Sequence, residues 1–320
     1  MSLPPGCPPG WLSGERFSVS QAIRTAWGLP DPEVRREFVL RAIAYMIGAT
    51  LVFAISSAIS KWLVATYPIG EVLFTRSLIS LIVVALIIMP RTGLAVFQTR
   101  RLPHHAMRTF SQFLSQSCLL IAFSLMPLSG AIAINFSAPL FTVLLSMLLL
   151  NEKVGFARWT ALLVGFAGVL IITNPTTDTF QFGAIFALAN AVIYGSVTAA
   201  VRGMTATESA ETLTLWQLVL ISGFFACLLP LGVKAPTLLD SGLILINGMT
   251  NGIGQYLWTR SLHLAPASSV TPFHYLMLVW VLVISFMVWG DVPTVSLLIG
   301  TAVVVGSGLF LLLREARRGP

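Results

Sequence analysis

Residues 108–152 read RTFSQFLSQSCLLIAFSLMPLSGAIAINFSAPLFTVLLSMLLLNE. The stretch consists of two apolar segments joined by a short turn at 126–129, and it ends on the acid Glu152. Residues 247–291, NGMTNGIGQYLWTRSLHLAPASSVTPFHYLMLVWVLVISFMVWGD, repeat this plan of apolar segment, turn, apolar segment and acid. The two stretches therefore predict an internal repeat, and this repeat decides the fold.

The two stretches align without gaps at a constant offset of 139 residues. Identity is low, but polar, turn and acidic positions coincide. The coinciding pairs are Gln112 with Asn251, Gln116 with Gln255, Pro127 with Pro266, Ser129 with Ser268, Asn135 with His274, and Glu152 with Asp291. We therefore expect buried polar positions to occur in pairs, one in each half of the chain.

Composition places the chain in a membrane. Of its 320 residues, 56% are hydrophobic and 10% are charged, and the mean hydropathy is +0.87. Soluble domains carry about 25% charged residues, so this chain lacks the polar groups to cover a globular surface. The net charge of +7 fits basic cytoplasmic loops better than a nucleic-acid partner. We expect a polytopic protein whose helices form one membrane domain in a lipid bilayer.

Ten apolar segments follow a polar, Pro- and Gly-rich tail at 1–37, which we interpret as a cytoplasmic N-terminal tail. Each segment is close to the ~20 residues that a membrane-spanning helix needs. Helices are expected because lipid offers no hydrogen-bond partners to the backbone. The predicted segments are 39–64, 70–89, 105–125, 129–150, 155–173, 181–202, 212–232, 239–260, 267–289 and 293–313, with a second tail at 314–320.

The basic residues predict the orientation. With the N-terminus in the cytoplasm, sixteen Lys and Arg residues fall on the cytoplasmic side, and Lys61, Arg76 and Lys234 remain on the other. Both termini are then cytoplasmic. Because five crossings separate the two halves, residues 38–174 and 180–313 would be inverted repeats. Inverted repeats with a central site are typical of transporters that work by alternating access.

The chain resembles the ten-helix EamA family of the drug/metabolite transporter superfamily over about residues 40–313. The resemblance rests on MPLSGAIAINFSAPLFTVLLSMLLLNEKVGFARW at 126–159, on ALLVGFAGVLIITNP at 161–175, on LFTRS at 73–77, and on the echo LAPASSV, VWGDVPT and GSG in the second half. Asp291 departs from the Glu that the family usually has there.

The sequences of these motifs are most similar to those of a branch of uptake carriers for riboflavin and S-adenosylmethionine. The resemblance implies a secondary carrier in a bacterial inner membrane that moves a small organic metabolite, such as riboflavin or a similar aromatic molecule. S-adenosylmethionine uptake and efflux of amino acids or other metabolites are the alternatives. The resemblance implies no cofactor. Oligomeric state is not readable, and a monomer is compatible with the sequence.

Polar side chains inside predicted helices are the candidate substrate-binding residues, since such residues are expensive in a membrane. Spacings of three and four place Gln112 and Gln116 on one stripe, and Asn251 and Gln255 on a matching one. The alternative is that these amides only bond neighbouring helices. The further candidates are Phe53, Arg76, Asn135, Asn190, Tyr194, Trp258, His274 and Tyr275.

Several of these candidates have a competing interpretation. The guanidinium N–H groups of Arg76 could bind a carboxylate or phosphate of the substrate. Alternatively, Arg76 forms an ion pair with a carboxylate of the outer loops, such as Glu71 or Asp291. His274 binds substrate or carries a proton, or it bonds a helix neighbour. We expect Lys61 and Arg202 to extend to lipid headgroups.

Further structural expectations concern glycines and histidines. Gly248 and Gly252 form a GxxxG pattern that predicts close helix packing. The adjacent His104 and His105 predict a solvated pair at the membrane surface, and no metal site is expected.

The absence of mid-helix acids limits the function. With the predicted segments, every Asp and Glu falls at a helix end or in a loop, so the usual carboxylate proton relay is missing. The sequence also shows no catalytic constellation. Three hypotheses remain: a secondary carrier, a membrane-embedded enzyme acting on a lipid-like substrate, and a passive channel.

Overall fold

A computed structural model describes residues 32–99, 101–138, 140–141, 156–172, 178–204, 208–264, 270 and 273–318. Within these residues the chain forms ten α-helices and two short 3₁₀ helices, and no strand. The α-helices are α2 (Pro32–Val64), α3 (Ile69–Thr92), α4 (Leu102–Leu125), α5 (Leu128–Asn135), α7 (Phe156–Ile172), α8 (Asp178–Met204), α9 (Ala210–Ala226), α10 (Leu238–Leu264), α12 (Leu276–Trp289) and α13 (Val295–Arg318). The 3₁₀ helices are η1 (Gly93–Phe97) and η2 (Leu229–Leu231).

A helix overlaps every one of the ten predicted segments, so the all-helical prediction is confirmed. Within the part of the chain that the structure describes, three stretches are long and apolar enough to cross a membrane: Glu37–Val64, Ile69–Pro90 and Glu211–Leu231. Shorter apolar stretches occur in α7, α8, α12 and α13. Helices α4 and α10 are not among these apolar stretches, because polar side chains inside them lower their mean hydropathy.

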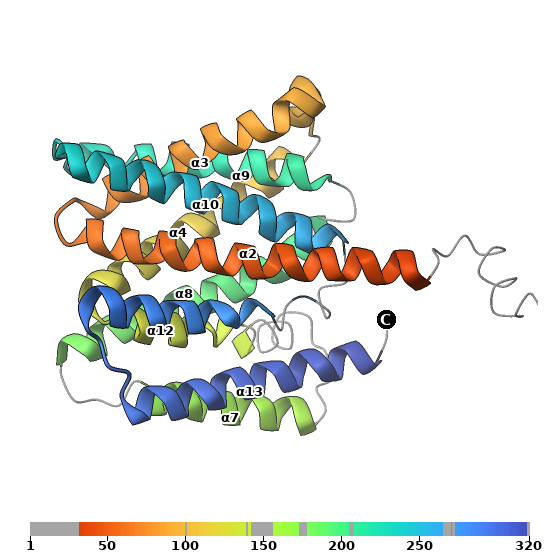
Figure 1. The fold of residues 1–320 in the computed structure, drawn as a ribbon, viewed down its shortest axis with the longest axis vertical. Coiled ribbons are helices and arrows are strands. Elements are labelled where there is room, and N and C mark those ends of the chain that lie inside the picture. The colour runs from red at the N-terminus through yellow and green to blue at the C-terminus, as the bar shows by residue number, and fades with distance from the viewer. Residues whose placement is uncertain are drawn as a thin grey trace, which may run out of the picture.

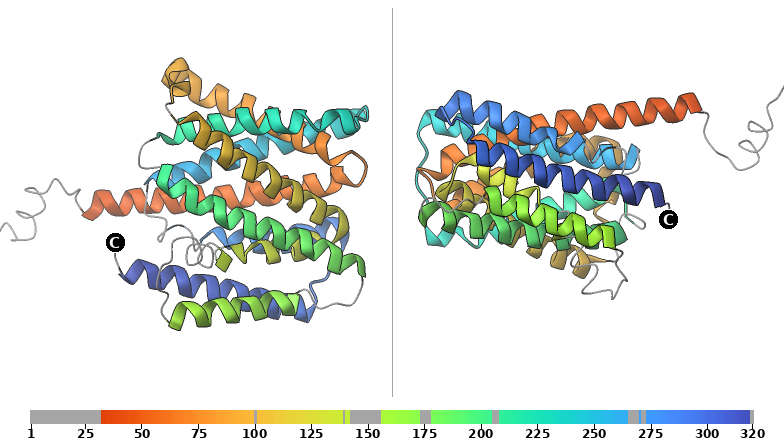
Figure 2. Two further views of the ribbon diagram at one scale, coloured as in Figure 1. Left: turned by 180° about the vertical axis from the view of Figure 1, so that it is seen from behind. Right: turned by 90° about the horizontal axis from the view of Figure 1, so that it is seen from below.

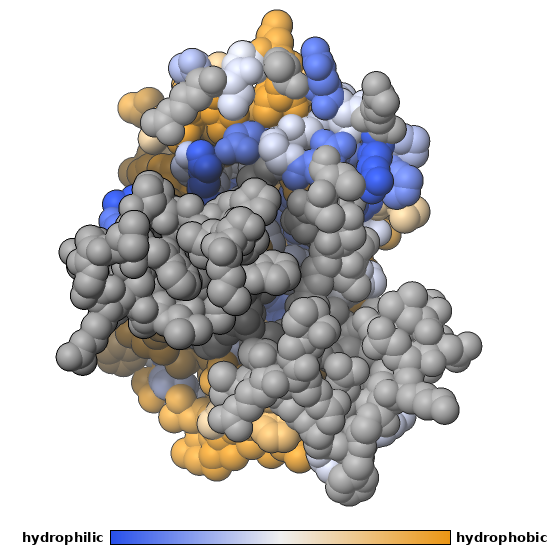
Figure 3. All heavy atoms as spheres, turned by 90° about the vertical axis from the view of Figure 1, so that its right-hand side faces the viewer, coloured by the Kyte–Doolittle hydropathy of each residue, from blue (hydrophilic) through white to orange (hydrophobic). Residues whose placement is uncertain are grey.

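The helices lie side by side, and successive helices run in opposite directions (Figures 1 and 2). As a result, the beginning of α2 and the end of α13 lie at the same end of the molecule. We call this the α2 N-terminal end. Figure 3 looks onto it: hydrophilic residues gather across part of this face, and hydrophobic residues form its margins. Exposed polar residues here include Glu37, Arg41 and His104.

The contacts between helices define two groups. In the first, α10 packs along α2 and α3, and α12 packs on α2. In the second, α8 packs along α4 and α5, and α9 packs on α4. We call these the α2 bundle and the α4 bundle. They meet chiefly where α3 packs on α9 and α5 on α12, while α7 and α13 pair with each other at one side (Figure 1).

Two glycines on α10 allow its close approach to α3. A Cβ atom added at Gly248 would lie 2.3 Å from Cβ of Ile79, and one at Gly252 would lie 3.0 Å from Cα of Ser80. Both distances are too short for a side chain. The predicted packing role of this GxxxG pattern is confirmed.

Two predicted helices are interrupted. The segment predicted at 129–150 forms α5, which ends at Asn135 with Phe136 as its C-cap, and residues 142–155 lie outside the described ones. The segment predicted at 267–289 contains α12, which starts after Tyr275, a residue in a turn. Phe136 and Tyr275 are themselves 139 residues apart, so the two interruptions fall at equivalent positions of the repeat.

Candidate functional site

Arg76 of α3 and Gln116 of α4 form the central polar contact between the two bundles. A guanidinium nitrogen of Arg76 donates to Oε1 of Gln116 at 2.6 Å, and a second donates to Oγ of Ser60 at 3.4 Å. Among the described residues, no carboxylate lies within ion-pair distance of Arg76. The carboxylate of Glu71 instead accepts from the backbone N–H of Lys234 at 3.0 Å. The interpretation of Arg76 as an ion-pair partner of Glu71 or Asp291 is therefore wrong.

Asn247 of α10 extends this polar contact into the α2 bundle. Its side chain is 1% exposed and its Oδ1 accepts from Oγ of Ser56 at 2.7 Å. The amide also bonds Oγ of Ser60, which links it to Arg76. One turn further along α10, Nδ2 of Asn251 donates to Oγ of Ser80 at 2.9 Å. Each of these bonds joins helices of one bundle, so Asn247 and Asn251 serve at least as packing contacts.

Asn190 of α8 plays the corresponding part in the α4 bundle. Its Nδ2 donates to Oδ1 of Asn135 at 2.6 Å, and its Oδ1 accepts from Oγ of Ser115 at 2.6 Å. Ser115 and Gln116 are consecutive on α4, so the bonds of both bundles meet at one depth. We call the set of Ser60, Arg76, Ser115, Gln116, Asn135, Asn190 and Asn247 the polar layer.

The aromatic residues of the two helix interruptions lie beside the polar layer. The ring of Phe136, the residue after Asn135, lies 5.1 Å from the ring of Tyr275 and 5.7 Å from that of His274. The buried Tyr275 hydroxyl and Nδ1 of His274 have no hydrogen-bond partner among the described residues. Since buried polar groups are normally paired, these two atoms are the candidate ligand-bonding atoms in this part of the described structure.

The remaining predicted residues are less central. No hydrogen bond to the half-buried side chain of Gln255 is formed by the described residues, and Trp258 packs with Ala42 and Met46 at the α2 N-terminal end. Phe53 packs against Gly254, where an added Cβ would lie 2.8 Å from its ring. Tyr194 interacts electrostatically with Arg108. The structure thus gathers Arg76, Gln116, Asn135, Asn190, His274 and Tyr275 together.

Two surface predictions need correction. Lys61 does not extend to headgroups, because its Nζ donates to the backbone oxygens of Phe123 and Met126 at 3.1 and 2.7 Å and so closes the C-terminal end of α4. The ammonium finds carbonyls that α4 leaves unbonded at its end. His104 is exposed, but His105 is 1% exposed and packs near Trp216, so the prediction of a solvated pair is wrong for His105. Glu152 and the side chain of Arg202 lie outside the described residues.

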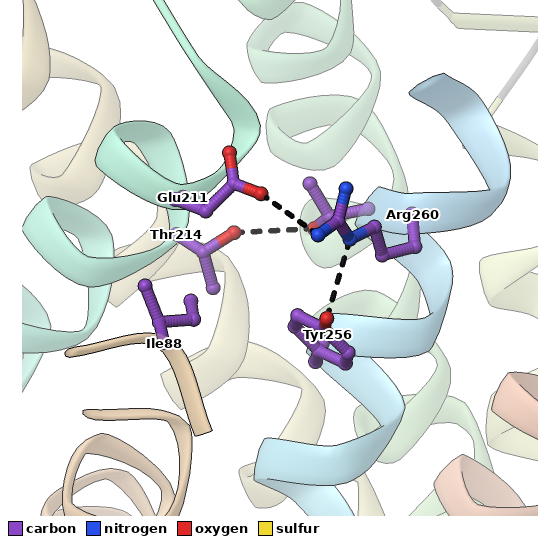
Figure 4. A pocket seen from close by; sticks show the side chains of 6 residues that line it. Ile88, Glu211, Thr214, Tyr256 and Arg260 are labelled. Carbon is purple, nitrogen blue, oxygen red and sulfur yellow. Dashed lines mark hydrogen bonds and ion pairs between the residues drawn. The ribbon is translucent and has the colours of Figure 1, made fainter. Parts of the chain in front are cut away.

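A second polar contact joins the bundles at the α2 N-terminal end (Figure 4). Glu211 of α9 and Arg260 of α10 form an ion pair at 3.2 Å, and Nε of Arg260 donates to the hydroxyl of Tyr256 at 3.2 Å. Thr214 donates to Thr259 at 3.3 Å beside them. In contrast to Arg76, this arginine has a carboxylate partner.

Sequence reasoning missed Ser56, Ser60 and Phe136. Ser56 and Ser60 stand four residues apart on one face of α2, and this spacing was a usable signal for a polar stripe. Phe136 carried no such signal in the sequence.

Ten antiparallel helices in a chain this poor in charge, with a polar layer at their centre, define a multi-pass helical membrane protein with an internal polar site. The model of the EamA-like transporter family matches residues 40–174 and again 181–313. The chain therefore belongs to the EamA-like transporter family.

Curated relatives agree with this assignment. A riboflavin transporter of Rhizobium johnstonii is 28% identical over 277 residues, covering 86% of this chain and 91% of its own length. An S-adenosylmethionine uptake transporter of Rickettsia bellii is 24% identical over 285 residues, covering 87% of this chain and 97% of its own. A crystal structure with 18% identity superposes with a TM-score of 0.61 over 87% of this chain and 99% of that one, which supports the fold.

The family and these relatives are transporters, not enzymes. The hypothesis of a membrane-embedded enzyme is therefore wrong, and the chain is a membrane transporter of this family.

Proposed function

We propose that the chain is a secondary carrier of the inner membrane that moves riboflavin, or a similar aromatic metabolite, by alternating access between two inverted repeats. The repeats are residues 38–174 and 180–313, with ten membrane crossings and both termini in the cytoplasm. The family model's two separate matches, one to each half of the chain, support this division.

The packing of the helices also supports the inverted repeat. The first repeat contributes α2, α3, α4, α5 and α7, and the second contributes α8, α9, α10, α12 and α13. Exchanging the repeats converts the contact of α2 with α10 into that of α8 with α4, and the contact of α3 with α10 into that of α9 with α4. All four contacts exist. Each bundle thus combines helices of both repeats, and a tilt of one bundle against the other would open the polar layer to either side.

The observation that carries the substrate assignment is the Arg76–Gln116 contact at 2.6 Å without a carboxylate beside it among the described residues. The half-buried guanidinium of Arg76, whose partners are neutral, attracts acceptor oxygens and repels cations. S-adenosylmethionine carries a sulfonium and an ammonium group, so this charge disfavours it. Riboflavin presents two ring carbonyls and several hydroxyls and carries no cationic group.

The polar layer and its aromatic neighbours match the two parts of a flavin. Arg76 and Gln116 would donate to the ring carbonyls. Phe136 and Tyr275, whose rings lie 5.1 Å apart, would pack on the flat ring system as the bundles part. The Tyr275 hydroxyl and Nδ1 of His274, which have no hydrogen-bond partner among the described residues, would bond hydroxyls of the ribityl chain.

Transport into proteoliposomes tests this function. We expect purified protein to move radiolabelled riboflavin without ATP, and we expect excess unlabelled riboflavin, but not S-adenosylmethionine, to compete. Riboflavin preloaded inside should speed uptake, because a carrier exchanges its substrate and a passive channel does not. Competition by S-adenosylmethionine as strong as that by riboflavin would overturn the substrate. Absence of transport for a broad panel of metabolites, including amino acids, would overturn the carrier.

A further inference from the structure

Arg108 is a second buried guanidinium that the polar layer does not use. It lies on α4, eight residues before Gln116, which corresponds to about 12 Å of helix rise toward the α2 N-terminal end. Its side chain is 7% exposed. One nitrogen, Nη2, donates to Oε1 of Gln217 and to the backbone oxygen of Leu213 on α9. The other, Nη1, is buried without a hydrogen-bond partner among the described residues.

Two neighbours on the same helix face share this condition. His105 and Thr109 stand three residues before and one after Arg108, so they are one helical turn apart from each other on α4. Both are 1% exposed, and neither Nε2 of His105 nor Oγ1 of Thr109 has a hydrogen-bond partner among the described residues. The nearest carboxylate oxygen, of Glu208, lies 4.0 Å from Nε2 of His105, beyond hydrogen-bond reach. Three unpaired buried polar groups on one turn are an unusual concentration, since such groups are rare in folded proteins.

Four described arginines form two groups that differ in their bonding partner, which is either a carboxylate or an amide. Arg260 and Arg41 pair with the carboxylates of Glu211 and Glu37. Arg76 and Arg108 each bond a glutamine amide instead, Gln116 and Gln217. A carboxylate would neutralise the charge, whereas an amide only orients the guanidinium. Arg76, which is half-buried, and Arg108, which is buried, therefore keep a full charge and further N–H donors.

We propose that Arg108, with His105 and Thr109, is a second substrate-binding position, which takes the acceptor oxygens of the transported metabolite at the α2 N-terminal end. This proposal rests on the proposed carrier function. In the present conformation α9 covers the position, since Arg108 bonds both Leu213 and Gln217 of that helix. The position is exposed when α9 moves away from α4 within the α4 bundle at this end, in addition to the tilt between the bundles, and the metabolite then occupies it on its way to or from Arg76.

The proposed position at Arg108 is tested by comparing the KM for riboflavin at the two sides of the membrane. Riboflavin transport is measured in proteoliposomes of defined orientation, with substrate supplied from either side. Arg108→Gln should raise KM about tenfold at the α2 N-terminal side, because one charged hydrogen bond is lost, and change it less than about twofold at the other side. Arg76→Gln should raise KM at both sides. An equal effect of Arg108→Gln at the two sides, or none at either, would refute the second position.

A thermal measurement without substrate gives an independent test. Replacing Arg108 by an apolar side chain removes the desolvation cost of a buried charge together with its two bonds to α9, whereas removing one partner of an ion pair leaves the other charge uncompensated and destabilises. We therefore expect Arg108→Met to change the melting temperature of the purified protein little, because the relief of the buried charge offsets the lost bonds to Gln217 and Leu213. The matched variant Arg260→Met should lower it, because Glu211 is then left unpaired. A fall for Arg108→Met as large as that for Arg260→Met would show that Arg108 is a structural residue.

The proposed carrier function and the second binding position can be refuted independently of each other. If the wild-type protein does not carry riboflavin, the proposed substrate is wrong, and the thermal comparison still decides whether Arg108 is uncompensated. If riboflavin is carried but the Arg108 variants behave as a structural residue would, the carrier function stands and the second position does not.

Discussion

Asn190 bonds Asn135 and Ser115 at 2.6 Å each, so a single side chain of α8 ties down both α5 and α4. The amide is 2% exposed. It also holds Asn135, the last residue of α5, at the point where that helix ends. Asn190 therefore fixes the position of the helix interruption inside its own bundle.

Replacing Asn190 should destabilise the protein. Asn190→Leu leaves Oδ1 of Asn135 and the hydroxyl of Ser115 without their partner, and each such buried group costs about 1–3 kcal/mol. We expect a lower melting temperature in detergent. Thr250→Ala serves as the control, since this hydroxyl bonds backbone oxygens of its own helix and should have little effect. Equal stability of both variants would contradict the structural role of Asn190.

Gln116 and Gln255, which are paired in the repeat, should differ when replaced by leucine. Gln116→Leu removes the partner of Arg76, so we expect loss of transport together with reduced stability. Gln255→Leu breaks no hydrogen bond among the described residues, so we expect loss of transport at unchanged stability. Riboflavin uptake and thermal unfolding are measured on the same preparations. Normal uptake by both variants would show that neither amide contacts the substrate.

Close packing at Gly248 predicts a strong effect of one methyl group. Gly248→Ala places a carbon 2.3 Å from Cβ of Ile79, so α10 and α3 must separate, which costs about 1–3 kcal/mol. Gly242 lies on the same helix with nothing within 4 Å of an added Cβ. Gly242→Ala should be neutral or stabilising by up to about 1 kcal/mol. Thermal unfolding of the two variants checks this, and a smaller loss at 248 than at 242 would contradict the packing.

The link between Tyr67 and Asp240 predicts a loss of stability at alkaline pH. The Tyr67 hydroxyl donates to the carboxylate of Asp240 at 2.6 Å, and this bond raises the pKa of Tyr67 above its ordinary value. A raised pKa favours the folded state below the pKa of the unfolded chain, about 10. That contribution is lost as the pH rises through the folded-state pKa. We expect the melting temperature to fall above about pH 10.

Tyr67→Phe provides the control for this pH dependence. The variant should be less stable than the wild type at neutral pH, and its melting temperature should fall less between pH 9 and 11, a range set by the ordinary tyrosine pKa of about 10. An identical alkaline decline in both proteins would assign it to other groups.

The helices could be predicted from the sequence because apolar length alone determines them. The interruptions after Asn135 and at Tyr275 were not predicted, because each lies in a segment whose length and overall hydropathy are sufficient for one continuous helix. One signal was present: Pro139 lacks the N–H group that would bond the carbonyl of Asn135 in a continued helix. The order of packing was also hidden, since periodicity shows which face of a helix is polar but not which helix it meets.

The residues of the site could be predicted from the sequence, but the hydrogen bonds between them could not. Spacing on α4 indicated Gln116, and the repeat indicated Asn135 and His274. The bond from Arg76 to Gln116 joins residues on different helices, and a single sequence holds no record of that proximity. Lys61 was misjudged for the same reason, because its partners are backbone oxygens of α4, which no side-chain pattern reveals.

The amide partners of Arg76 and Arg108 also have an electrical consequence. When the proposed carrier changes the side to which it is open, each uncompensated charge moves relative to the field across the membrane, a change of about 2.3 kcal/mol per 100 mV if it crosses the whole field. A neutral substrate leaves that charge in place, so voltage acts on the loaded and the empty carrier alike. A singly charged anionic substrate cancels one such charge, so voltage acts more weakly on the loaded carrier than on the empty one. The voltage dependence of exchange compared with net uptake would therefore report the charge of the transported molecule.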